Sequence, residues 1–399
     1  MSVPVIRFNS FSEDWHLESI SSVISNKSKK YDPIKAIEDL PCIELEHLSQ
    51  QTGEILDTIS AKDQKSIKNI FDENSVLFGK LRPYLRKFAR PDFKGVCSSE
   101  IWVLKSKKLQ PDFLFQYIQT DNFFELTQIQ AGSKMPRADW ESISKGEIYF
   151  PNSKEQTKIA SFLSAVDEKI SQLTQKHELL SQYKQGMMQK LFSQQIRFKA
   201  DDGSEFGEWE NYSLKELLLK VIDNRGKTPD TKPDLDIPLI EINAVGNRNV
   251  DYSKVSKFVS KDTFNSWFRA YLEDKDILFS TVGNTAICSI YSSQVQAGIA
   301  QNLVGLRARK EVVESVFLYY LLIVESNNKK FKAIEMQAVQ PSIKVSQMIH
   351  INFEIPKSLT EQIKISNFLS SIDQKIEVVA QQIEQAKQWK KGLLQQMFV

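Results

Sequence analysis

Basic side chains gather in two short segments of the first half of the chain. Residues 78–94 (FGKLRPYLRKFARPDFK) hold six lysines and arginines and one aspartate, with Tyr84 and Phe88 between them. Lys134 and Arg137 lie in AGSKMPRADW, whose glycine and proline are typical of a loop. Arginine, lysine and amide side chains on loops grip phosphates and contact the edges of bases. Both segments are therefore candidates for contact with nucleic acid.

The second half of the chain offers polar loops with fewer charges. Residues 224–228 (NRGKT) and 337–347 (QAVQPSIKVSQ) supply amides, hydroxyls and a few basic side chains. Basic loops are more often plain solvated surface than binding sites. A competing interpretation is that the arginines of the first half pair with the protein's own carboxylates, such as Asp92 or Asp139. The loops alone leave both interpretations open.

No arrangement of catalytic residues accompanies these loops. The string nearest to a phosphate-binding P-loop, residues 226–228 (GKT), has Val221 where the motif needs its first glycine. Two strings resemble a metal-dependent nuclease core, but Trp102 and Asn243 stand where the required lysine would be. Four scattered histidines and three scattered cysteines favour neither a metal site nor a disulfide framework. The sequence predicts a chain that catalyses nothing by itself and binds no metal.

The composition is that of an ordinary globular protein. Hydrophobic residues make up 41% of the 399 residues, and that length predicts two or three domains. The 52 basic and 50 acidic residues leave a net charge of +2, so a nucleic-acid surface would have to come from local clustering. The longest apolar stretch, residues 316–324, is too short for a bilayer span of about 20 residues, and no secretory signal is visible. A cytoplasmic location is expected.

The two halves of the chain repeat each other. Residues 154–192 align without gaps onto residues 360–398, and 17 of the 39 positions are identical. Near the start of each half an IRF string precedes a phenylalanine and a tryptophan, and SVLFGKLRP in the first half is echoed by DILFSTVGN in the second. Such self-similarity predicts a duplicated unit, in which a mixed α/β domain of about 150 residues precedes a helical segment.

Both repeated segments follow the heptad spacing of a coiled coil. Apolar residues recur at alternating steps of four and three, and at ~1.5 Å per residue each helix would be roughly 58 Å long. The principal seam residues are Ile159, Leu163, Val166, Ile170, Leu173, Ile365, Leu369, Ile372, Ile376 and Val379. His177 and Lys184 also occupy seam positions, where polar residues set register. Gly186 and Gly392 predict close backbone contact, with a partner or with the other helix.

The two domains are expected to mix strands with helices. The predicted strands are residues 101–104, 148–150, 237–245, 277–279, 299–306 and 349–355. The predicted helices inside the domains are residues 111–130 and 312–335. A polar linker, residues 193–209, joins the first helical segment to the second domain.

The duplicated arrangement resembles the specificity (S) subunit of type I restriction-modification enzymes. The similarity covers the whole chain, and its most specific strings are EQTKIASFLSAVDEKI with EQIKISNFLSSIDQKI and YKQGMMQKLF with WKKGLLQQMF. The loops AGSKMPRADWESI and MQAVQPSIKVSQM are also similar. The resemblance implies an α+β fold with target-recognition domains at residues 1–150 and 201–356. It also implies helical spacers at residues 151–200 and 357–399, packed as an antiparallel coiled coil with pseudo-twofold symmetry.

The resemblance further implies how such a chain works. Each recognition domain would contact one half of a bipartite, asymmetric DNA site, and a rod of about 58 Å would separate the halves by ~17 base pairs. The helices would dock two methyltransferase (M) subunits and, through them, restriction/translocase (R) subunits. S-adenosylmethionine, ATP and Mg would be cofactors of those partners, with none in this chain. Two alternatives stay open: a fused methyltransferase or nuclease, and a coiled-coil scaffold with two protein-binding heads.

The resemblance also places the DNA contacts, although the two domains differ too much for base-by-base assignment. The positions that match motifs near DNA in the family are Lys80, Arg82, Tyr84, Arg86, Ser133, Lys134, Arg137, Asn224, Arg225, Lys227, Thr281, Asn284, Gln340, Ser342 and Lys344.

Overall fold

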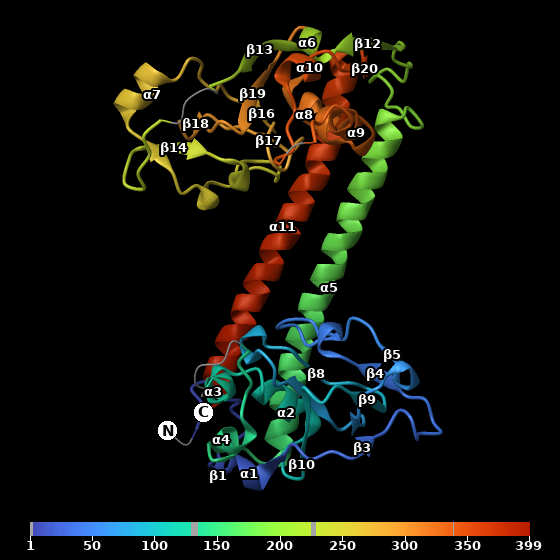
Figure 1. Ribbon diagram of the computed structural model, residues 1–399, viewed down its shortest axis with the longest axis vertical. Helices are drawn as coiled ribbons and strands as arrows, with labels where there is room; N and C mark the ends of the chain where they lie inside the picture. Colours follow the sequence, from blue (N-terminus) through green and yellow to red (C-terminus); the bar gives the residue numbers. More distant parts are fainter. Residues whose placement is uncertain (1–2, 129–134, 225–228, 338) are drawn as a thin grey trace. The chain divides into compact units, whose positions relative to one another are not determined.

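The computed structural model describes residues 3–128, 135–224, 229–337 and 339–399 (Figure 1). The chain divides into two compact units, each of which combines a domain with parts of two long helices. Unit 1 comprises Met1–Thr174 and Ala380–Val399, and unit 2 comprises Gln175–Val379. Each unit therefore draws on segments that are distant in the sequence.

The domain of unit 1 is built from three sheets. A four-stranded sheet has the order β2 (Ile24–Ser25), β10 (Ile101–Ser106), β7 (Val76–Gly79), β8 (Phe88–Ala89). A five-stranded sheet has the order β3 (Lys30–Tyr31), β6 (Lys68–Phe71), β9 (Gly95–Cys97), β4 (Pro41–Ile43), β5 (Ile59–Ser60). In the third sheet β1 (His16–Ser19) pairs with β11 (Glu147–Phe150). The helices of this domain are α1 (Ile20–Val23), α2 (Pro111–Tyr117), α3 (Asp121–Thr127) and α4 (Trp140–Ser144).

The central strand β7 is buried on both of its faces. Its side chains alternate, as the two-residue period of a strand requires. Val76 and Phe78 pack into a hydrophobic cluster with side chains of α2 and α3. Leu77 points the other way and packs with Ile43 and Phe71 of the five-stranded sheet. The all-apolar sequence VLF is thereby explained, and β7 becomes a rigid support for the loop that follows it.

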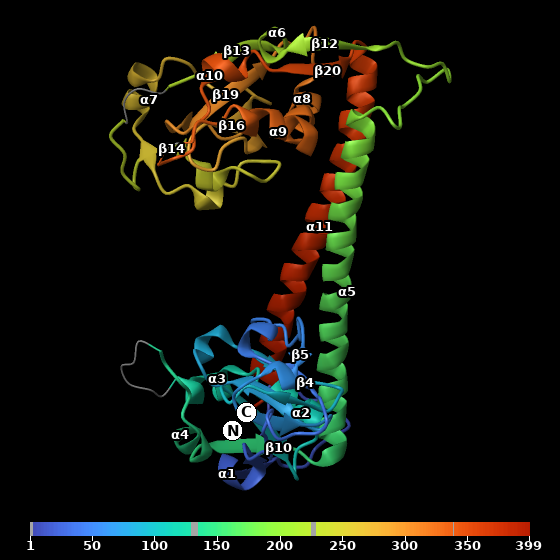
Figure 2. The ribbon, with the colours of Figure 1, turned by 45° about the vertical axis from the view of Figure 1, so that its right-hand side comes forward.

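The domain of unit 2 repeats this plan. A four-stranded sheet has the order β13 (Leu218–Ile222), β19 (Leu303–Ala308), β16 (Ile277–Ser280), β17 (Cys288–Ile290). A three-stranded sheet has the order β15 (Phe258–Val259), β14 (Ile237–Ile240), β18 (Gly298–Ile299). Strand β12 (Trp209–Ser213) pairs with β20 (Asn352–Pro356), which runs directly into a long helix (Figure 2). The helices are α6 (Leu214–Leu217), α7 (Lys261–Trp267), α8 (Ser315–Ile323), α9 (Glu325–Ala333) and α10 (Val345–Met348).

Short 3₁₀ turns complete the two domains. They are Leu45–His47, Ala61–Asp63, Pro83–Leu85, Ile242–Ala244 and Tyr252–Lys254.

Two long helices, α5 (Ser153–Phe192) and α11 (Leu359–Met397), follow the two domains. In unit 1 the start of α5 packs antiparallel to the end of α11, since the ring centroids of Phe162 and Trp389 are 6.1 Å apart. In unit 2 the end of α5 packs antiparallel to the start of α11, with Lys184 Nζ 2.5 Å from Asp373 Oδ1. The predicted seam residues are buried, apart from Ile170 and Ile376. These two are half-buried, Ile170 against the hydrophobic core of unit 1 and Ile376 against that of unit 2.

The helices predicted inside the domains are each broken in two. Residues 111–127 form α2 and α3, because the Thr120 hydroxyl accepts a hydrogen bond from Phe123 N and so starts a new helix. Residues 129 and 130 of the predicted stretch lie outside the described residues. Residues 312–335 form α8 and α9, because Val324 takes an extended backbone conformation between them. Both stretches are therefore helical, as predicted, but each contains a break, because apolar periodicity does not register a local cap.

Several predicted strands are shorter than expected. The stretch 237–245 ends as a strand at Ile240, and residues 299–306 are divided between β18 and β19. In the predicted strand 349–355, pairing begins at Asn352.

The glycines repeated in the long helices do not mark contact between the helices. A Cβ built on Gly186 would meet nothing within 4 Å, and one built on Gly392 would meet only the Gln396 side chain at 3.9 Å. Among the described residues, then, the expected contact with the other helix is absent. The alternative, contact with a partner, stays a prediction.

Within the described ranges, no helix is both long enough and apolar enough to cross a bilayer.

Candidate nucleic-acid interface

In unit 1 the basic segment and the glycine-proline loop come together. The chain leaves β7 at Lys80, and the backbone N–H of Arg82 donates to the carbonyl of Pro136 at 2.8 Å. Ala138 N donates in turn to Lys80 O at 2.8 Å. We call residues 80–86 and 135–138 the unit 1 paired loops. Arg82 and Arg137, which are distant in the sequence, therefore lie on neighbouring backbones.

The same backbone arrangement recurs in unit 2. Gly283 N donates to Pro341 O at 2.9 Å, and Ile343 N donates to Thr281 O at 2.8 Å. We call residues 281–287 and 339–343 the unit 2 paired loops. The two sets of bonds match one to one, so Arg82 corresponds to Gly283 and Arg137 corresponds to Ser342. The similar strings found in the two halves thus form one structure in two copies.

Each pair of loops contains two positions in the left-handed backbone region. In unit 1 these are Arg82 (φ 52°) and Arg86 (φ 47°), and in unit 2 they are Gly283 (φ 82°) and Ala286 (φ 60°). A side-chain-bearing residue in this region costs roughly 1–2 kcal/mol relative to the right-handed form, whereas glycine adopts it freely. Unit 1 thus carries an arginine at a position where unit 2 carries the sterically favoured residue.

The exposed side chains of the unit 1 paired loops are mainly basic or aromatic. Arg82 and Tyr84 are exposed, and Lys80 is half-buried. Arg137 is half exposed, and its Nε lies 3.1 Å from Glu100 Oε2. The arginine stays accessible from one side in spite of this ion pair.

Arg86 differs from the other basic residues of these loops. Its guanidinium donates to Asp121 Oδ1 at 2.6 Å and lies 3.8 Å above the centroid of the Phe124 ring. The hydrogen bond from Arg86 is the main reason that the pKa of Asp121 is lowered. Arg86 therefore ties its loop to α3, and its guanidinium is engaged within the domain. The competing idea of internal pairing fits Arg86, although its partner is neither Asp92 nor Asp139.

The unit 2 paired loops expose amides and an apolar tip. Asn284 and Gln340 are exposed and Ser342 is half-buried, while Lys344 is exposed just before α10. Val339, which was not among the predicted contacts, is fully exposed. This surface differs in chemistry from its counterpart in unit 1.

Two predicted contacts of the second half are structural instead. Asn224 is buried, and its amide accepts from Ala270 N at 3.2 Å and donates to Ala270 O at 3.0 Å. Thr281 is fully buried, with its hydroxyl 3.3 Å from Asn302 O. Both predictions are corrected, because these side chains are enclosed by their own domain. Ser133, Lys134, Arg225 and Lys227 lie outside the described residues.

A half-buried ion pair on the long helices was missed by the sequence analysis. In unit 1 Lys390 Nζ lies 2.6 Å from Asp167 Oδ1 and donates to Gln119 Oε1 at 2.5 Å. Gln116 of α2 also donates to Asp167, at 3.1 Å, and Gln119 lies just after that helix, so both partners are held by the same part of the domain. Burial lowers the pKa of the Lys390 ammonium. The pair joins α5, α11 and the domain at one point.

Unit 2 repeats the ion pair with different neighbours. Asp373 pairs with Lys184 at 2.5 Å and accepts a hydrogen bond from the Tyr320 hydroxyl at 2.5 Å. Arg248 donates to Ser370 Oγ at 3.1 Å, one turn away. The signal for both pairs was present in the repeat, because Asp and Lys are conserved between its two copies at these positions.

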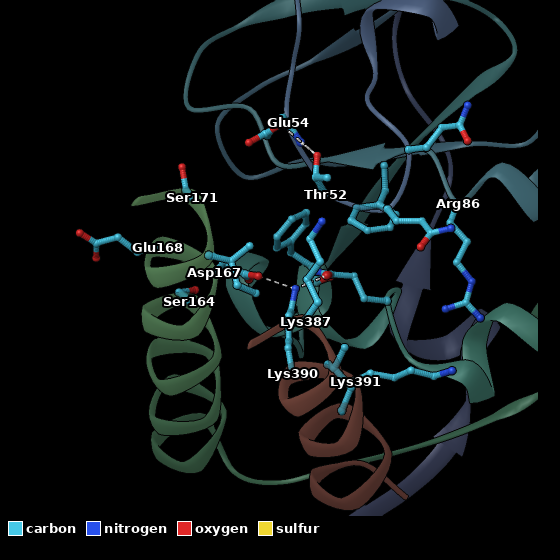
Figure 3. A pocket seen from close by; sticks show the side chains of 18 of the residues that line it. Thr52, Glu54, Arg86, Ser164, Asp167, Glu168, Ser171, Lys387, Lys390 and Lys391 are labelled. Carbon is cyan, nitrogen blue, oxygen red and sulfur yellow. Dashed lines mark hydrogen bonds and ion pairs between the residues drawn. The ribbon is translucent and has the colours of Figure 1, made fainter. Parts of the chain in front are cut away.

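A cavity of about 910 Å³ opens beside the pair in unit 1 (Figure 3). Its walls are residues 50–54, α5 and the end of α11, which contributes Lys387, Lys390 and Lys391. Glu54, Glu168 and Glu384 line it as well, so charges of both signs face the space. This mixed lining does not select a particular small ligand.

Groups suited to metal binding or covalent catalysis are scarce. Among the described residues, no three or more His, Cys, Asp or Glu side chains cluster closely enough to hold a metal ion. All three cysteines are buried, and burial raises the pKa of the Cys42 thiol to about 11, which disfavours the nucleophilic thiolate.

Comparison with known proteins gives this architecture a family. The family model described as "Type I restriction modification DNA specificity domain" matches residues 12–182 and again residues 207–388. The type I restriction enzyme MjaVIII specificity subunit of Methanocaldococcus jannaschii is 26% identical over 405 residues, covering 96% of this chain and 91% of the relative. The EcoDI specificity subunit of Escherichia coli is 27% identical over 116 residues, covering 28% and 26% of the two chains.

Solved structures show the same fold. The type I restriction-modification S subunit from M. genitalium matches with a TM-score of 0.59 at 16% identity, covering 100% of this chain and 99% of that one. A chain from a type I restriction-modification system, solved to study complex assembly, matches with a TM-score of 0.56 at 17% identity, covering 95% and 96%. The predicted α+β arrangement with its internal repeat is thereby confirmed. The chain belongs to the type I restriction-modification specificity subunit family, whose members supply DNA sequence recognition rather than catalysis.

Proposed function

We propose that each domain contacts one half of a bipartite, asymmetric DNA site through its paired loops. The observation that carries this proposal is the recurrence of one backbone arrangement, with different exposed side chains, at equivalent places in the two units. A constant frame with variable side chains is what two independent readers of different sequences require. The proposed recognition domains are residues 1–150 and 201–356, with spacers at residues 151–200 and 357–399.

The proposed DNA contacts are the predicted residues that the structure leaves accessible. They are Lys80, Arg82, Tyr84, Arg137, Asn284, Gln340, Ser342 and Lys344. The four predicted residues outside the described ranges, Ser133, Lys134, Arg225 and Lys227, remain part of the proposal on the resemblance alone.

We further propose that the helices dock two methyltransferase subunits, and through them restriction/translocase subunits that use ATP and Mg. Tyr183 and Trp389 occupy the same position of the repeat and are about half exposed. Gly186 and Gly392 follow three residues later, on the same helix face, with open space or little above them. An exposed aromatic beside bare backbone, present twice, suits two copies of one partner. S-adenosylmethionine would be bound by that partner, in the cytoplasm.

The first test maps adenine methylation in a cell that produces the chain with its methyltransferase subunit. A bipartite, asymmetric motif is expected. Inserting one heptad into each of α5 and α11 should lengthen the gap between the two halves of the motif. An unchanged gap would refute the role of the helices as a ruler, and methylation without sequence preference would refute the recognition role.

The second test concerns docking. A chain with Tyr183→Ala and Trp389→Ala should retain less methyltransferase subunit in a co-purification assay than the unaltered chain. Ile37→Ala is a matched control, because Ile37 is a highly exposed apolar residue of the unit 1 domain, between β3 and β4. Equal recovery of the partner with all three chains would contradict the proposed docking face.

A further inference from the structure

The paired loops of the two units share their backbone and differ in the charge of their tips. Four cations stand on the described unit 1 loops: Arg86 pairs with Asp121, whereas Lys80, Arg82 and Arg137 are exposed or half-buried. Neither residues 281–287 nor residues 339–343 contain a charged side chain. A common frame therefore presents guanidinium and ammonium donors in one unit, and amides and methyl groups in the other.

Arg82 is the most informative of these residues. It occupies a left-handed position that its equivalent in unit 2 fills with Gly283, and both residues donate the same backbone hydrogen bond. The loop geometry thus does not need an arginine there, and would be formed more easily with glycine. The Arg82 side chain is exposed and forms no hydrogen bond or ion pair with any residue in the described part of the chain. Arg82 thus has an unfavourable backbone conformation, and its guanidinium is accessible. This combination suggests that the guanidinium binds a partner outside the protein.

The unit 2 tip has the opposite chemistry. Val339 and Gln340 are exposed, and nearby Met336 and Ser342 exchange backbone hydrogen bonds of 2.8 and 3.3 Å. Asn284 is exposed on the neighbouring loop. Because Val339 is fully exposed, its methyl groups are accessible to an apolar part of a ligand.

We propose that the two domains select half-sites of different base composition, an inference that rests on the proposed function. Arg82 contacts a guanine in the half-site of unit 1, and Gln340 with Val339 contacts an A·T pair in the half-site of unit 2. Guanine presents O6 and N7 in the major groove as a pair of acceptors that a guanidinium fork matches. Adenine presents N6 and N7, which match the donor and acceptor of a glutamine amide, and thymine presents a methyl group for an apolar contact.

The experiment uses the assembled complex of the chain with its methyltransferase subunit, and a library of randomised double-stranded DNA. The unaltered complex should enrich a bipartite sequence with guanine in one half and A·T pairs in the other. Arg82→Gly should reduce the preference for one guanine by about tenfold. It should not lower the melting temperature of the chain, because Gly283 shows that the loop accepts glycine. Gln340→Ala should relax one A·T position in the other half only.

Lys275→Gly supplies the matched control. Lys275 is an exposed cation that also has a left-handed backbone (φ 67°), but it precedes β16, whereas the paired loops follow that strand. Its variant should enrich the same sequence as the unaltered complex. If the complex selects a bipartite sequence and Arg82→Gly leaves every base preference intact, the base-composition inference is overturned while the proposed function stands. If the unaltered complex selects no sequence, the proposed function itself fails.

Discussion

The two recognition domains achieve the same loop geometry with different side chains. In both, a strand buried on two faces, β7 or β16, leads into a loop that is tied by backbone hydrogen bonds to the segment before a short helix. Main-chain groups make these ties, so they impose little on the exposed side chains. The comparison teaches that such a domain can change what it contacts without rebuilding its frame.

The attachment of each domain to the long helices also combines shared residues with residues that differ between the units. The Asp–Lys pair is common to both units, but amides of Gln116 and Gln119 surround it in unit 1, whereas the Tyr320 hydroxyl and nearby Arg248 surround it in unit 2. The helix residues are repeated and the domain residues are not. Around this pair, conservation between the copies therefore follows the helices. At the helix starts, residues outside the helices are repeated too, since Arg7 pairs with Glu155 as Arg197 pairs with Glu361.

The largest expected effect comes from exchanging a whole domain. If residues 1–150 are replaced by the corresponding domain of another family member, one half of the methylated motif should change and the other half should persist. The reason is that each set of paired loops is complete within its own unit. Methylated adenines mapped before and after the exchange would test this. A change in both halves, or in neither, would show that the domains do not act independently.

The second expected effect is on stability. Asp167→Ala leaves the largely buried Lys390 ammonium without its carboxylate. Since Asp167 is 30% exposed, the free energy of unfolding should fall by about 1–3 kcal/mol. Lys390→Met should cost less, because Asp167 keeps its bond from Gln116. The double variant should recover part of the loss. Thermal denaturation of the four chains would measure this order, and equal losses in both single variants would argue against a buried unpaired charge as the cause.

The long helices could be predicted from the sequence to within about a residue, whereas the site could be predicted only in part. Heptad spacing repeats over the full length of α5 and α11, so the bounds of these helices depend little on tertiary contacts. The break at Thr120 and the burial of Asn224 depend on single side-chain bonds that no periodicity records. The basic segment was found because its composition is unusual, but composition cannot distinguish Arg82, which faces outward, from Arg86, which pairs with Asp121.

The third prediction compares Lys80 with Arg86 in DNA binding. Each phosphate contact contributes about −0.9 to the slope of log affinity against log salt concentration. A phosphate-contacting Lys80 should therefore flatten the slope by about one unit when replaced by alanine, and Arg86→Ala should leave the slope unchanged. Arg137→Ala should relax discrimination in one half-site by ~1–3 kcal/mol. Parallel salt lines for Lys80→Ala and the unaltered chain would remove Lys80 from the DNA-facing set.

The smallest expected effect is a pH dependence of stability. It distinguishes the two contacts of Arg86, the ion pair with Asp121 and the packing on the Phe124 ring. The hydrogen bond from Arg86 lowers the pKa of Asp121, so the folded state binds a proton at this carboxylate less readily than the unfolded state does. The resulting stability is complete above about pH 4 and is lost as the pH falls through the lowered pKa. Since both side chains are partly exposed, the ion pair should contribute about 1 kcal/mol or less.

Arg86→Met should therefore lower the melting temperature slightly at pH 7, and the difference from the unaltered chain should shrink below about pH 4. Asp121→Asn should show the same convergence, because it removes the titrating group itself. The packing of Arg86 on the Phe124 ring does not titrate in this range. A difference that stays constant from pH 7 to about pH 3 would mean that Arg86 holds the loop to α3 through the aromatic ring rather than through the carboxylate.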